Sequence, residues 1–331
     1  AHPATTELVS QAIKRAIDAC DMPTGVFNMV QSTTPQVAQQ LVQHPQVKAV
    51  GFTGSQKVGD ILNKLTQERP IAIPFFGELG STNPQFILPQ KLASDAVALA
   101  TNQVASMLMG HGQFCTSPGL VVVQNSDGLE NYLTMLANAI SEAPAGTMLT
   151  KGIAQTYNSQ VDTLLSNPSL THIASGATSN GGCQSSANAF SVSASDFIAQ
   201  PALQEEVFGP CALIVICDND EQMNEFALSL TGQLTASVFG SDDELLDYID
   251  LVDDIAQSVG RLMFNQLPTG VEVCHSMQHG GPYPASTAPQ TTSVGSQAIN
   301  RFMRPICLQN MPTALQPEEI KDGATHPQVI V

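Results

Sequence analysis

Residues 48–80 decide the fold, and their sequence is KAVGFTGSQKVGDILNKLTQERPIAIPFFGELG. An apolar segment at 48–52 is followed by a helical pattern that ends near Gln67, and a second apolar segment lies at 71–76. Short apolar segments bounded by glycine or proline are typical of buried strands. A strand, a helix and a strand in immediate succession predict parallel strands joined by a crossover helix, so we expect an α/β fold.

The same alternation continues on both sides of this stretch. Hydrophobic periodicity predicts further helices and strands, whereas two stretches rich in small and polar residues, 175–187 and 268–292, predict loops. The expected helices are 5–20, 35–43, 94–109, 127–141, 150–166, 220–230 and 243–258. The expected strands are 26–30, 85–88, 120–123, 212–216, 234–239, 261–265 and an isolated late strand at 304–309.

The composition restricts the possible partners. The 331 residues are 43% hydrophobic and carry a net charge of −17. The negative charge argues against nucleic acid or an anionic membrane surface as a partner. The seven cysteines are scattered without a CxxC motif, which is typical of reduced thiols in a cytosolic protein. No apolar run reaches the ~18 residues of a membrane span, and no signal peptide is visible, so we expect a cytoplasmic protein.

One cysteine is a candidate nucleophile. Cys115 lies in the stretch HGQFCT (111–116), between small and polar residues and just before a Ser-Pro-Gly break. The other six cysteines lie in apolar, strand or loop contexts that are typical of structural residues. A reactive thiol needs a lowered pKa or a nearby base. His111 is four residues away and could pair with Cys115, but a histidine that stabilises the end of a helix is the favoured interpretation.

Three further stretches carry candidate binding or catalytic groups. The stretch GFTGS (51–55) joins a strand to a helix, where free N–H groups suit a phosphate, although a capped turn without a ligand is commoner. Glu78 follows an apolar strand, at the sheet edge where α/β sites form, and could act as a general base. Glu206 lies in EEVFGP (205–210) and could accept hydrogen bonds from ribose hydroxyls, although such glutamates are usually only solvated.

The sequence predicts no metal site. Of the seven histidines, only His275 and His279 have a spacing that resembles paired ligands, and both lie in a stretch expected to be a loop. A single pair of this kind is a weak zinc motif.

Together, four stretches in this order resemble the aldehyde dehydrogenase superfamily. They are GFTGS (51–55), ELG (78–80), GQFCT (112–116) and EVFGP (206–210), and the resemblance covers essentially the whole chain. Ser81 stands where most of the family has a glycine. The segments GRLMFNQLPTGV (260–271) and HGGPYP (279–284) resemble the branch that holds 2,5-dioxovalerate (α-ketoglutaric semialdehyde) dehydrogenases and the fatty aldehyde dehydrogenase of luminous bacteria.

The resemblance implies NAD(P)-dependent oxidation of an aldehyde to a carboxylic acid. It implies that Cys115 is the nucleophile, which forms a thiohemiacetal and then a thioester, and that Glu78 is the base for the hydrolytic water. The cofactor is expected to be NADP or NAD, and the substrate an oxo-acid semialdehyde such as 2,5-dioxovalerate, with a long-chain fatty aldehyde as the alternative. The implied cofactor contacts are Thr53, Gly54 and Ser55 at the pyrophosphate, Leu79, Glu206 at the nicotinamide ribose and Phe208 beside the nicotinamide.

The resemblance also implies a domain organisation. Residues 1–80 would be the last part of a Rossmann-like cofactor domain, 81–303 the α/β catalytic domain, and 304–331 an oligomerisation strand and tail, which predicts a homodimer or homotetramer. Family members are longer, and the part that supplies an oxyanion-hole asparagine and an adenosine-binding lysine would precede Ala1. The chain is therefore expected to be a C-terminal fragment, and the residues that choose between NAD and NADP fall in the same preceding part.

Two alternatives from other classes remain open. One is a cysteine hydrolase that uses Cys115 and His111 without a nicotinamide cofactor. The other is a non-catalytic fragment that only folds and assembles.

We expect the 331-residue chain by itself to be inactive or nearly so, because part of the oxyanion hole and of the cofactor site is expected upstream of it. The measurement is aldehyde-dependent reduction of NADP and NAD, followed by absorbance. Detectable turnover by this chain would contradict the expectation.

Overall fold

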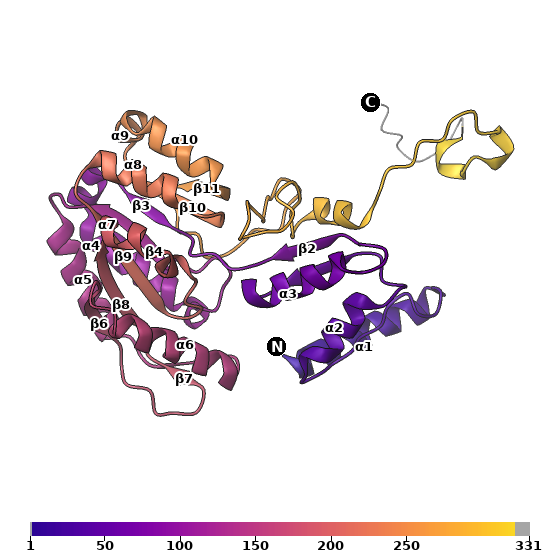
Figure 1. Ribbon diagram of the computed structural model, residues 1–331, viewed down its shortest axis with the longest axis horizontal. Helices are drawn as coiled ribbons and strands as arrows, with labels where there is room; N and C mark the ends of the chain where they lie inside the picture. The colour runs from indigo at the N-terminus through magenta and orange to yellow at the C-terminus, as the bar shows by residue number, and fades with distance from the viewer. Residues whose placement is uncertain (1, 322–331) are drawn as a thin grey trace. The chain divides into compact units, whose positions relative to one another are not determined.

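The computed structural model describes residues 2–321, which form two compact units that divide between Ala298 and Ile299 (Figure 1). In the described part of the chain, every strand and every α-helix belongs to the first unit. The second unit contains 3₁₀ turns at Thr313–Leu315 and Glu318–Ile320.

A seven-stranded sheet is the centre of the first unit. In spatial order its strands are β11 (Val259–Phe264), β10 (Gln233–Phe239), β3 (Gln85–Ile87), β4 (Leu120–Gln124), β9 (Cys211–Cys217), β8 (Asn188–Ser193) and β6 (Thr171–Ser175). All neighbouring strands are parallel except β6 and β8. The register aligns five apolar side chains in one row across the sheet: Val238, Phe86, Val122, Val215 and Val192.

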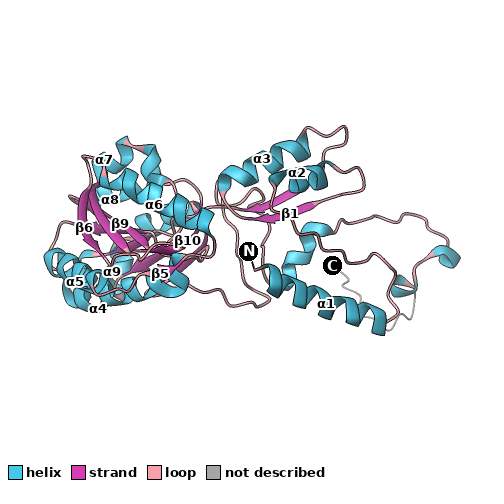
Figure 2. Ribbon diagram, turned by 90° about the horizontal axis from the view of Figure 1, so that it is seen from below, coloured by secondary structure: helices cyan, strands magenta, loops and turns pink. Residues whose placement is uncertain are grey.

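Helices cover both faces of this sheet (Figure 2). The aligned row packs into a core with α6 (Lys151–Leu165), α7 (Ala194–Ala199), α8 (Asp220–Ser229) and α10 (Ile249–Gln257). Residues of the opposite face, such as Val121 and Ile214, pack against α4 (Pro89–Leu108) and α5 (Leu129–Ser141). Because the central strands are buried on both faces, their sequences are continuously apolar, as in LVVV (120–123).

Two further sheets have two strands each. The strands β1 (Val50–Thr53) and β2 (Phe75–Glu78) are parallel. The helices α2 (Pro35–Gln43) and α3 (Gln56–Gln67) pack on them through Val42 and Leu62, which form a small core with Phe75. The helix α1 (Pro3–Ala19) contains no buried residue. The strands β5 (Gly146–Thr147) and β7 (Gln184–Ser185) form a short antiparallel pair.

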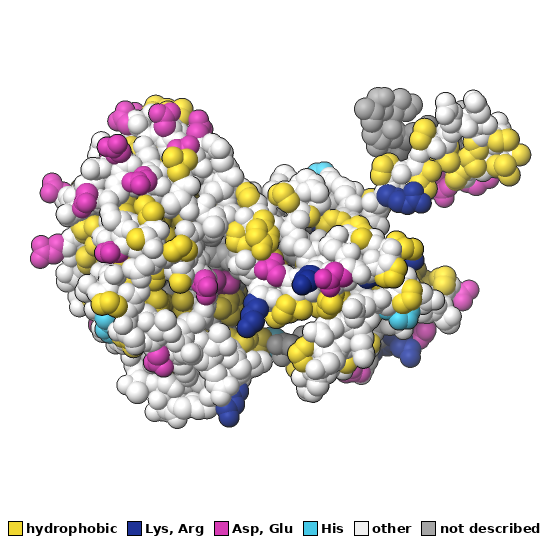
Figure 3. Space-filling model, in the orientation of Figure 1, with side chains coloured by type: hydrophobic (Ala, Val, Ile, Leu, Met, Phe, Trp, Pro, Cys, Tyr) yellow, Lys and Arg dark blue, Asp and Glu magenta, His cyan; other side chains and the backbone are white. Residues whose placement is uncertain are grey.

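Much of the acidic charge lies on α8, α9 (Asp242–Asp247) and α10. Figure 3 shows Asp and Glu side chains gathered at the upper left, over these helices. Apart from the buried Glu244, the acidic side chains of these helices are exposed or half-buried, while apolar side chains enter the core. None of the helices in residues 2–321 combines the length and apolar composition that a membrane crossing requires.

The structure confirms the α/β prediction and most of the predicted elements. The prediction of a strand at 26–30 was wrong. This segment is a bend followed by coil, and β1 and β2 make up their sheet without it. The strand predicted at 71–76 begins only at Phe75, because Pro74 has no N–H to donate to a neighbouring strand. The strands β6 and β8 were not predicted, because their serine, threonine and asparagine content is typical of loops.

Other boundaries also differ from the sequence expectation. The helix that leads to Cys115 begins at Pro89 and not near residue 94, and the helix predicted at 243–258 is two helices that meet at Tyr248. The segment 304–309 is not a strand. A strand forms only when its backbone is hydrogen-bonded to a neighbouring strand. The described residues of the second unit contain no such neighbouring strand. The predicted tail beyond residue 321 lies outside the described residues.

The start of α4 depends on a carboxylate from another helix. Leu88 is its N-cap residue and has no side-chain hydrogen bond to offer. Glu244 of α9 instead accepts the backbone N–H of Gln90 at 2.6 Å and that of Lys91 at 3.1 Å. The carboxylate is 1% exposed, so it satisfies two N–H groups at the positive end of the α4 dipole within the core.

Replacement of Glu244 by alanine should lower the free energy of unfolding by about 2–3 kcal/mol, because two N–H groups at the positive end of α4 lose a charged acceptor. Denaturant-induced unfolding measures the change. Asp243→Ala is the matched control, since Asp243 is exposed in the same helix and its replacement should change the free energy by less than about 0.5 kcal/mol. Equal effects of the two substitutions would show that Glu244 does not stabilise α4.

Candidate active site

The loop that carries Cys115 follows α4 directly. A 3₁₀ turn at Met109–Gly112 redirects the chain, with φ angles of 56° at Gly110, 56° at His111 and 69° at Gly112. A Cβ atom at Gly112 would lie 2.2 Å from the carbonyl carbon of Gly209. Only glycine permits this close approach, so the Cys115 loop packs directly on the 206–210 loop.

Asn83 fixes the Cys115 loop from the sheet. Its side-chain nitrogen donates to the carbonyl oxygens of Cys115 and Ser117, at 2.9 Å each. Its Oδ1 atom accepts the hydroxyls of Ser81 at 3.0 Å and Thr235 at 2.9 Å. Asn83 is fully buried, with a φ of 50° that asparagine tolerates better than most residues. One amide therefore ties the thiol loop to the connection between β2 and β3.

Glu78 is the last residue of β2 and is held by the same connection. The backbone N–H of Leu79 donates to the Ala285 carbonyl at 2.8 Å. Gln233 Oε1 accepts the backbone N–H of Thr82 at 2.8 Å. The end of β2 is thus attached both to the 268–292 loop and to the seven-stranded sheet.

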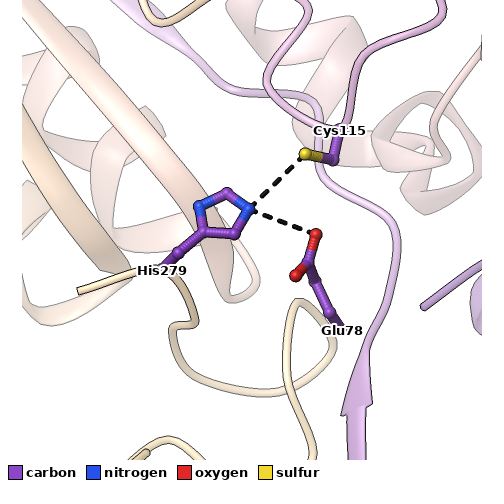
Figure 4. Close-up of side chains that lie close together, drawn as sticks. All are labelled: Glu78, Cys115 and His279. Carbon is purple, nitrogen blue, oxygen red and sulfur yellow. Dashed lines mark hydrogen bonds and ion pairs between the residues drawn. The ribbon is translucent and has the colours of Figure 1, made fainter. Parts of the chain in front are cut away.

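Cys115, Glu78 and His279 form a compact cluster (Figure 4). The His279 Nε2 atom lies 3.4 Å from Cys115 Sγ and 3.1 Å from Glu78 Oε1. The Ser293 hydroxyl donates to the other oxygen of Glu78. Glu78 and His279 are 6% and 2% exposed. A thiol, an imidazole and a carboxylate from three distant parts of the sequence therefore share one buried site.

The 268–292 loop positions His279 through its backbone. The His279 N–H donates to Thr292 Oγ1 at 2.9 Å, and the Ser293 N–H donates to the His279 carbonyl at 2.8 Å. The Nδ1 atom is buried without a hydrogen-bond partner among the described residues. The ring thus directs only its Nε2 atom at polar groups of the cluster.

The cluster keeps the thiol protonated and the carboxylate charged. Burial raises the pKa of Cys115 to about 12, and the charge of Glu78, a hydrogen bond to it and the charge of Glu206 act in the same direction. Burial also raises the pKa of Glu78, but hydrogen bonds from His279, Ser293 and Cys115 and the charge of His279 outweigh it, so the net pKa is lowered. In this arrangement the thiol donates to an anionic Glu78 and is not yet a nucleophile.

Glu206 lies over Gly80. Its Oε2 atom would be 2.9 Å from a Cβ at Gly80, so a side chain at residue 80 would displace the Glu206 carboxylate. Burial raises the pKa of Glu206 to about 8, against the hydrogen bond from the Ser81 backbone N–H. A cavity of about 200 Å³ is lined by Glu206 and Phe208 and, on the side of the thiol loop, by Gly112 and Ser117, although not by Cys115 itself.

The GFTGS turn fits a phosphate. Ser55 is the N-cap residue of α3, and its hydroxyl makes no capping hydrogen bond. Gly54 and Ser55 are exposed, so the first N–H groups of the helix and this hydroxyl are accessible to an anion. Thr53 is the register partner of Glu78, which connects this turn to the cluster through one pair of strands. Leu79 packs against Gly59 of α3.

The structure brings Cys115 and Glu78 together, but it does not place His111 with them. The His111 Nε2 atom lies 3.0 Å from the Ser185 carbonyl oxygen, and its ring packs against Gly146.

The imidazole next to Cys115 is that of His279, which the sequence analysis considered only as half of a zinc pair. His275 does not pair with it, since its ring nitrogens contact Ser296 and Gln297. The HGGPYP motif (279–284) was the only sign in the sequence that His279 belongs to the site. Spacing could not reveal the contact, because Cys115 and His279 are 164 positions apart.

Comparison with known proteins establishes the family. The aldehyde dehydrogenase family matches residues 2–305, so the chain belongs to that family. It is 42% identical to α-ketoglutaric semialdehyde dehydrogenase 2 of Azospirillum brasilense, over 98% of this chain and 62% of the relative. It is 39% identical to α-ketoglutaric semialdehyde dehydrogenase of Acinetobacter baylyi, over 97% of this chain and 61% of the relative. The chain thus spans less than two thirds of the length of these relatives.

A solved structure shows the same fold. Glyceraldehyde-3-phosphate dehydrogenase GapN of Methanocaldococcus jannaschii, complexed with NADP, superposes with a TM-score of 0.70 at 20% identity. The superposition covers 86% of this chain and 60% of that one. At this identity the similarity is evidence for the fold alone.

Replacement of Glu78 by glutamine should lower the pKa of Cys115, because it removes the largest charge that opposes thiolate formation. The pKa should stay above its usual value, since burial remains. A fall of one unit raises the thiolate fraction about tenfold at neutral pH, so alkylation of Cys115 by iodoacetamide should accelerate by about that factor. Peptide mass spectrometry across a pH series measures the rate.

Glu206→Gln is the matched control, because Glu206 contributes the weaker of the two charges that raise the pKa of Cys115. Its effect on the alkylation rate should be clearly smaller. An unchanged or slower rate in Glu78→Gln would contradict the assignment of Glu78 as the group that holds the thiol protonated.

Proposed function

We propose that this chain carries the catalytic site of an NAD(P)-dependent aldehyde dehydrogenase that oxidises an oxo-acid semialdehyde such as 2,5-dioxovalerate. The observation that carries the proposal is the contact of Cys115 with His279 and Glu78 in a chain of the aldehyde dehydrogenase family. The names of the Azospirillum and Acinetobacter relatives support the substrate class. A long-chain aldehyde is the alternative substrate.

In this proposal Cys115 Sγ attacks the aldehyde carbon and forms a thiohemiacetal. The thiol proton passes to a group in contact with it, Glu78 or His279, because the thiol is protonated before substrate arrives. A bound nicotinamide cofactor would supply the hydride acceptor. The proton taken from the thiol leaves to solvent, so that Glu78 is again a carboxylate before hydrolysis. Glu78 then takes a proton from the water that hydrolyses the resulting thioester on Cys115, and the carboxylic acid leaves.

The binding groups proposed for the cofactor lie at two places. The N-terminus of α3, with Thr53, Gly54 and Ser55, would hold the pyrophosphate, and Leu79 would border it. Glu206 would hold the nicotinamide ribose. Its raised pKa supports this role, since a protonated carboxyl group both donates to and accepts from a diol. Phe208 would lie beside the nicotinamide in the same cavity.

The proposal includes the domain limits 1–80, 81–303 and 304–331, and a homodimer or homotetramer. Ile306 and Leu308 are 65% and 47% exposed, which is consistent with a segment that pairs with another subunit. A cysteine hydrolase that uses His111 is less well supported, because the His111 ring contacts Ser185 and not the thiol.

The experiment uses a chain of the relatives' full length that contains these residues. Mixed with 2,5-dioxovalerate and NAD or NADP, Glu78→Gln should accumulate an acyl adduct on Cys115, because the water that releases it lacks its base. Deacylation should slow by about 10²–10⁴-fold. Intact-protein and peptide mass spectrometry detect the adduct, and a long-chain aldehyde is the comparison substrate.

Cys115→Ala should abolish both the adduct and turnover, whereas His111→Ala should retain them. An acyl adduct, two hydrogens lighter than the thiohemiacetal, that forms without any nicotinamide cofactor would contradict the proposed mechanism, and so would full turnover by Glu78→Gln. Loss of activity in His111→Ala would favour the hydrolase.

A further inference from the structure

We infer that Cys115, His279 and Glu78 form a binding site for a divalent cation of intermediate softness, with Zn²⁺ the best fit, and that the bound ion blocks the thiol. The sequence predicted no metal site, because the three ligands are far apart along the chain. Among residues 2–321, their ligand atoms lie within 4.8 Å of one another.

Two of the three separations are close to the edges of a tetrahedral zinc site. Zinc bonds of about 2.3 Å to sulfur, about 2.0–2.1 Å to nitrogen and about 2.0–2.2 Å to oxygen give edges of about 3.5 Å from sulfur to nitrogen and about 3.3 Å from nitrogen to oxygen. The observed separations are 3.4 Å from Cys115 Sγ to His279 Nε2 and 3.1 Å from that nitrogen to Glu78 Oε1. Small side-chain movements are therefore enough to admit an ion between the three atoms.

The donor set selects the kind of ion. A thiolate, an imidazole and a carboxylate suit Zn²⁺, whereas Mg²⁺ and Ca²⁺ prefer oxygen ligands alone. Binding replaces the S–H proton by the metal and releases that proton to solvent, and the proton that His279 Nε2 donates to Glu78 moves to Nδ1, so that Nε2 has a free lone pair. The thiolate and the Glu78 carboxylate together then neutralise the two charges of the ion. Three protein ligands leave the fourth position for water, as in open zinc sites.

Two features limit the affinity of this site. The outer ring nitrogen of His279 has no partner among the described residues, whereas zinc-binding histidines usually donate it to an acceptor. Arg261 is a cation close enough to interact with the charge of Cys115, although its guanidinium is already bonded to the Pro268 and Gly270 carbonyls. On the favourable side, Ser293 orients the Glu78 carboxylate. We therefore expect reversible binding that a chelator removes, unlike a closed structural zinc site.

Metal binding and attack on an aldehyde use the same sulfur lone pairs, so they exclude each other. The inference of a metal site depends only on the geometry of the cluster. The inference that the ion inhibits aldehyde oxidation depends also on the proposed function. The test therefore measures binding without an activity assay and uses the 331-residue chain.

The first measurement is spectroscopic titration with Co²⁺ as a probe for Zn²⁺. We expect one Co²⁺ per chain, with a thiolate-to-cobalt charge-transfer band that added Zn²⁺ removes. The band should be absent in Cys115→Ser and weaker in His279→Gln and Glu78→Gln. Cys274→Ser and His275→Gln are matched controls, because they change a neighbouring thiol and imidazole that are not in the cluster, and they should leave the band unchanged.

The second measurement needs no variant. Zn²⁺ should slow alkylation of Cys115 by at least about tenfold, because the thiolate is both the metal ligand and the nucleophile, and chelator should restore the rate. The alkylation rate of Cys274 in the same sample is the internal control. A band that persists in Cys115→Ser, or an alkylation rate of Cys115 that Zn²⁺ leaves unchanged, overturns the inference.

Discussion

The Asn83 side chain is the constraint on which the site depends. Its amide nitrogen holds the carbonyls of Cys115 and Ser117, while its oxygen accepts hydroxyls from the β2–β3 connection and from β10. Glu78 ends the strand just before this connection. The distance between thiol and carboxylate is therefore set by one buried residue, and it does not depend on the flexibility of two separate loops. The same amide links the β1–β2 sheet to the seven-stranded sheet.

A carboxylate next to a thiol makes the thiolate less stable, because two negative charges would then be close together. The Glu78 charge adds to burial in holding the Cys115 proton, and the same contacts lower the pKa of Glu78, so the resting cluster contains a weak nucleophile and a weak base. Chemistry at this thiol requires that the Glu78 charge be neutralised, moved away or balanced by a cation. His279 is the balancing group within the chain, because its Nε2 atom contacts both partners.

The sequence predicted the parts of the structure that depend on local order. Apolar segments separated by helices predicted the parallel sheet, and the structure brings together the glycine-flanked thiol and the carboxylate at the end of β2. It could not predict β6 and β8, because strands rich in serine, threonine and asparagine have the composition of loops. It also could not predict that His279 would contact Cys115 and that His111 would not. These outcomes depend on the path of the 268–292 loop and on the turn at Gly110–Gly112, which no spacing rule encodes.

His279 also shows why proton transfer and metal binding belong to one site. Its single accessible nitrogen faces a sulfur and an oxygen, and it can donate one proton to only one of them at a time. When it donates to Glu78, the thiol keeps its own proton; when the ring is neutral with Nε2 unprotonated, the same lone pair can accept that proton or bind a metal ion. A cluster that can accept a thiol proton therefore has the lone pairs that a zinc ion requires. Nδ1 has no partner among the described residues, whereas the Glu78 carboxylate accepts from Nε2, so Nε2 becomes a ligand or an acceptor only when that proton moves away.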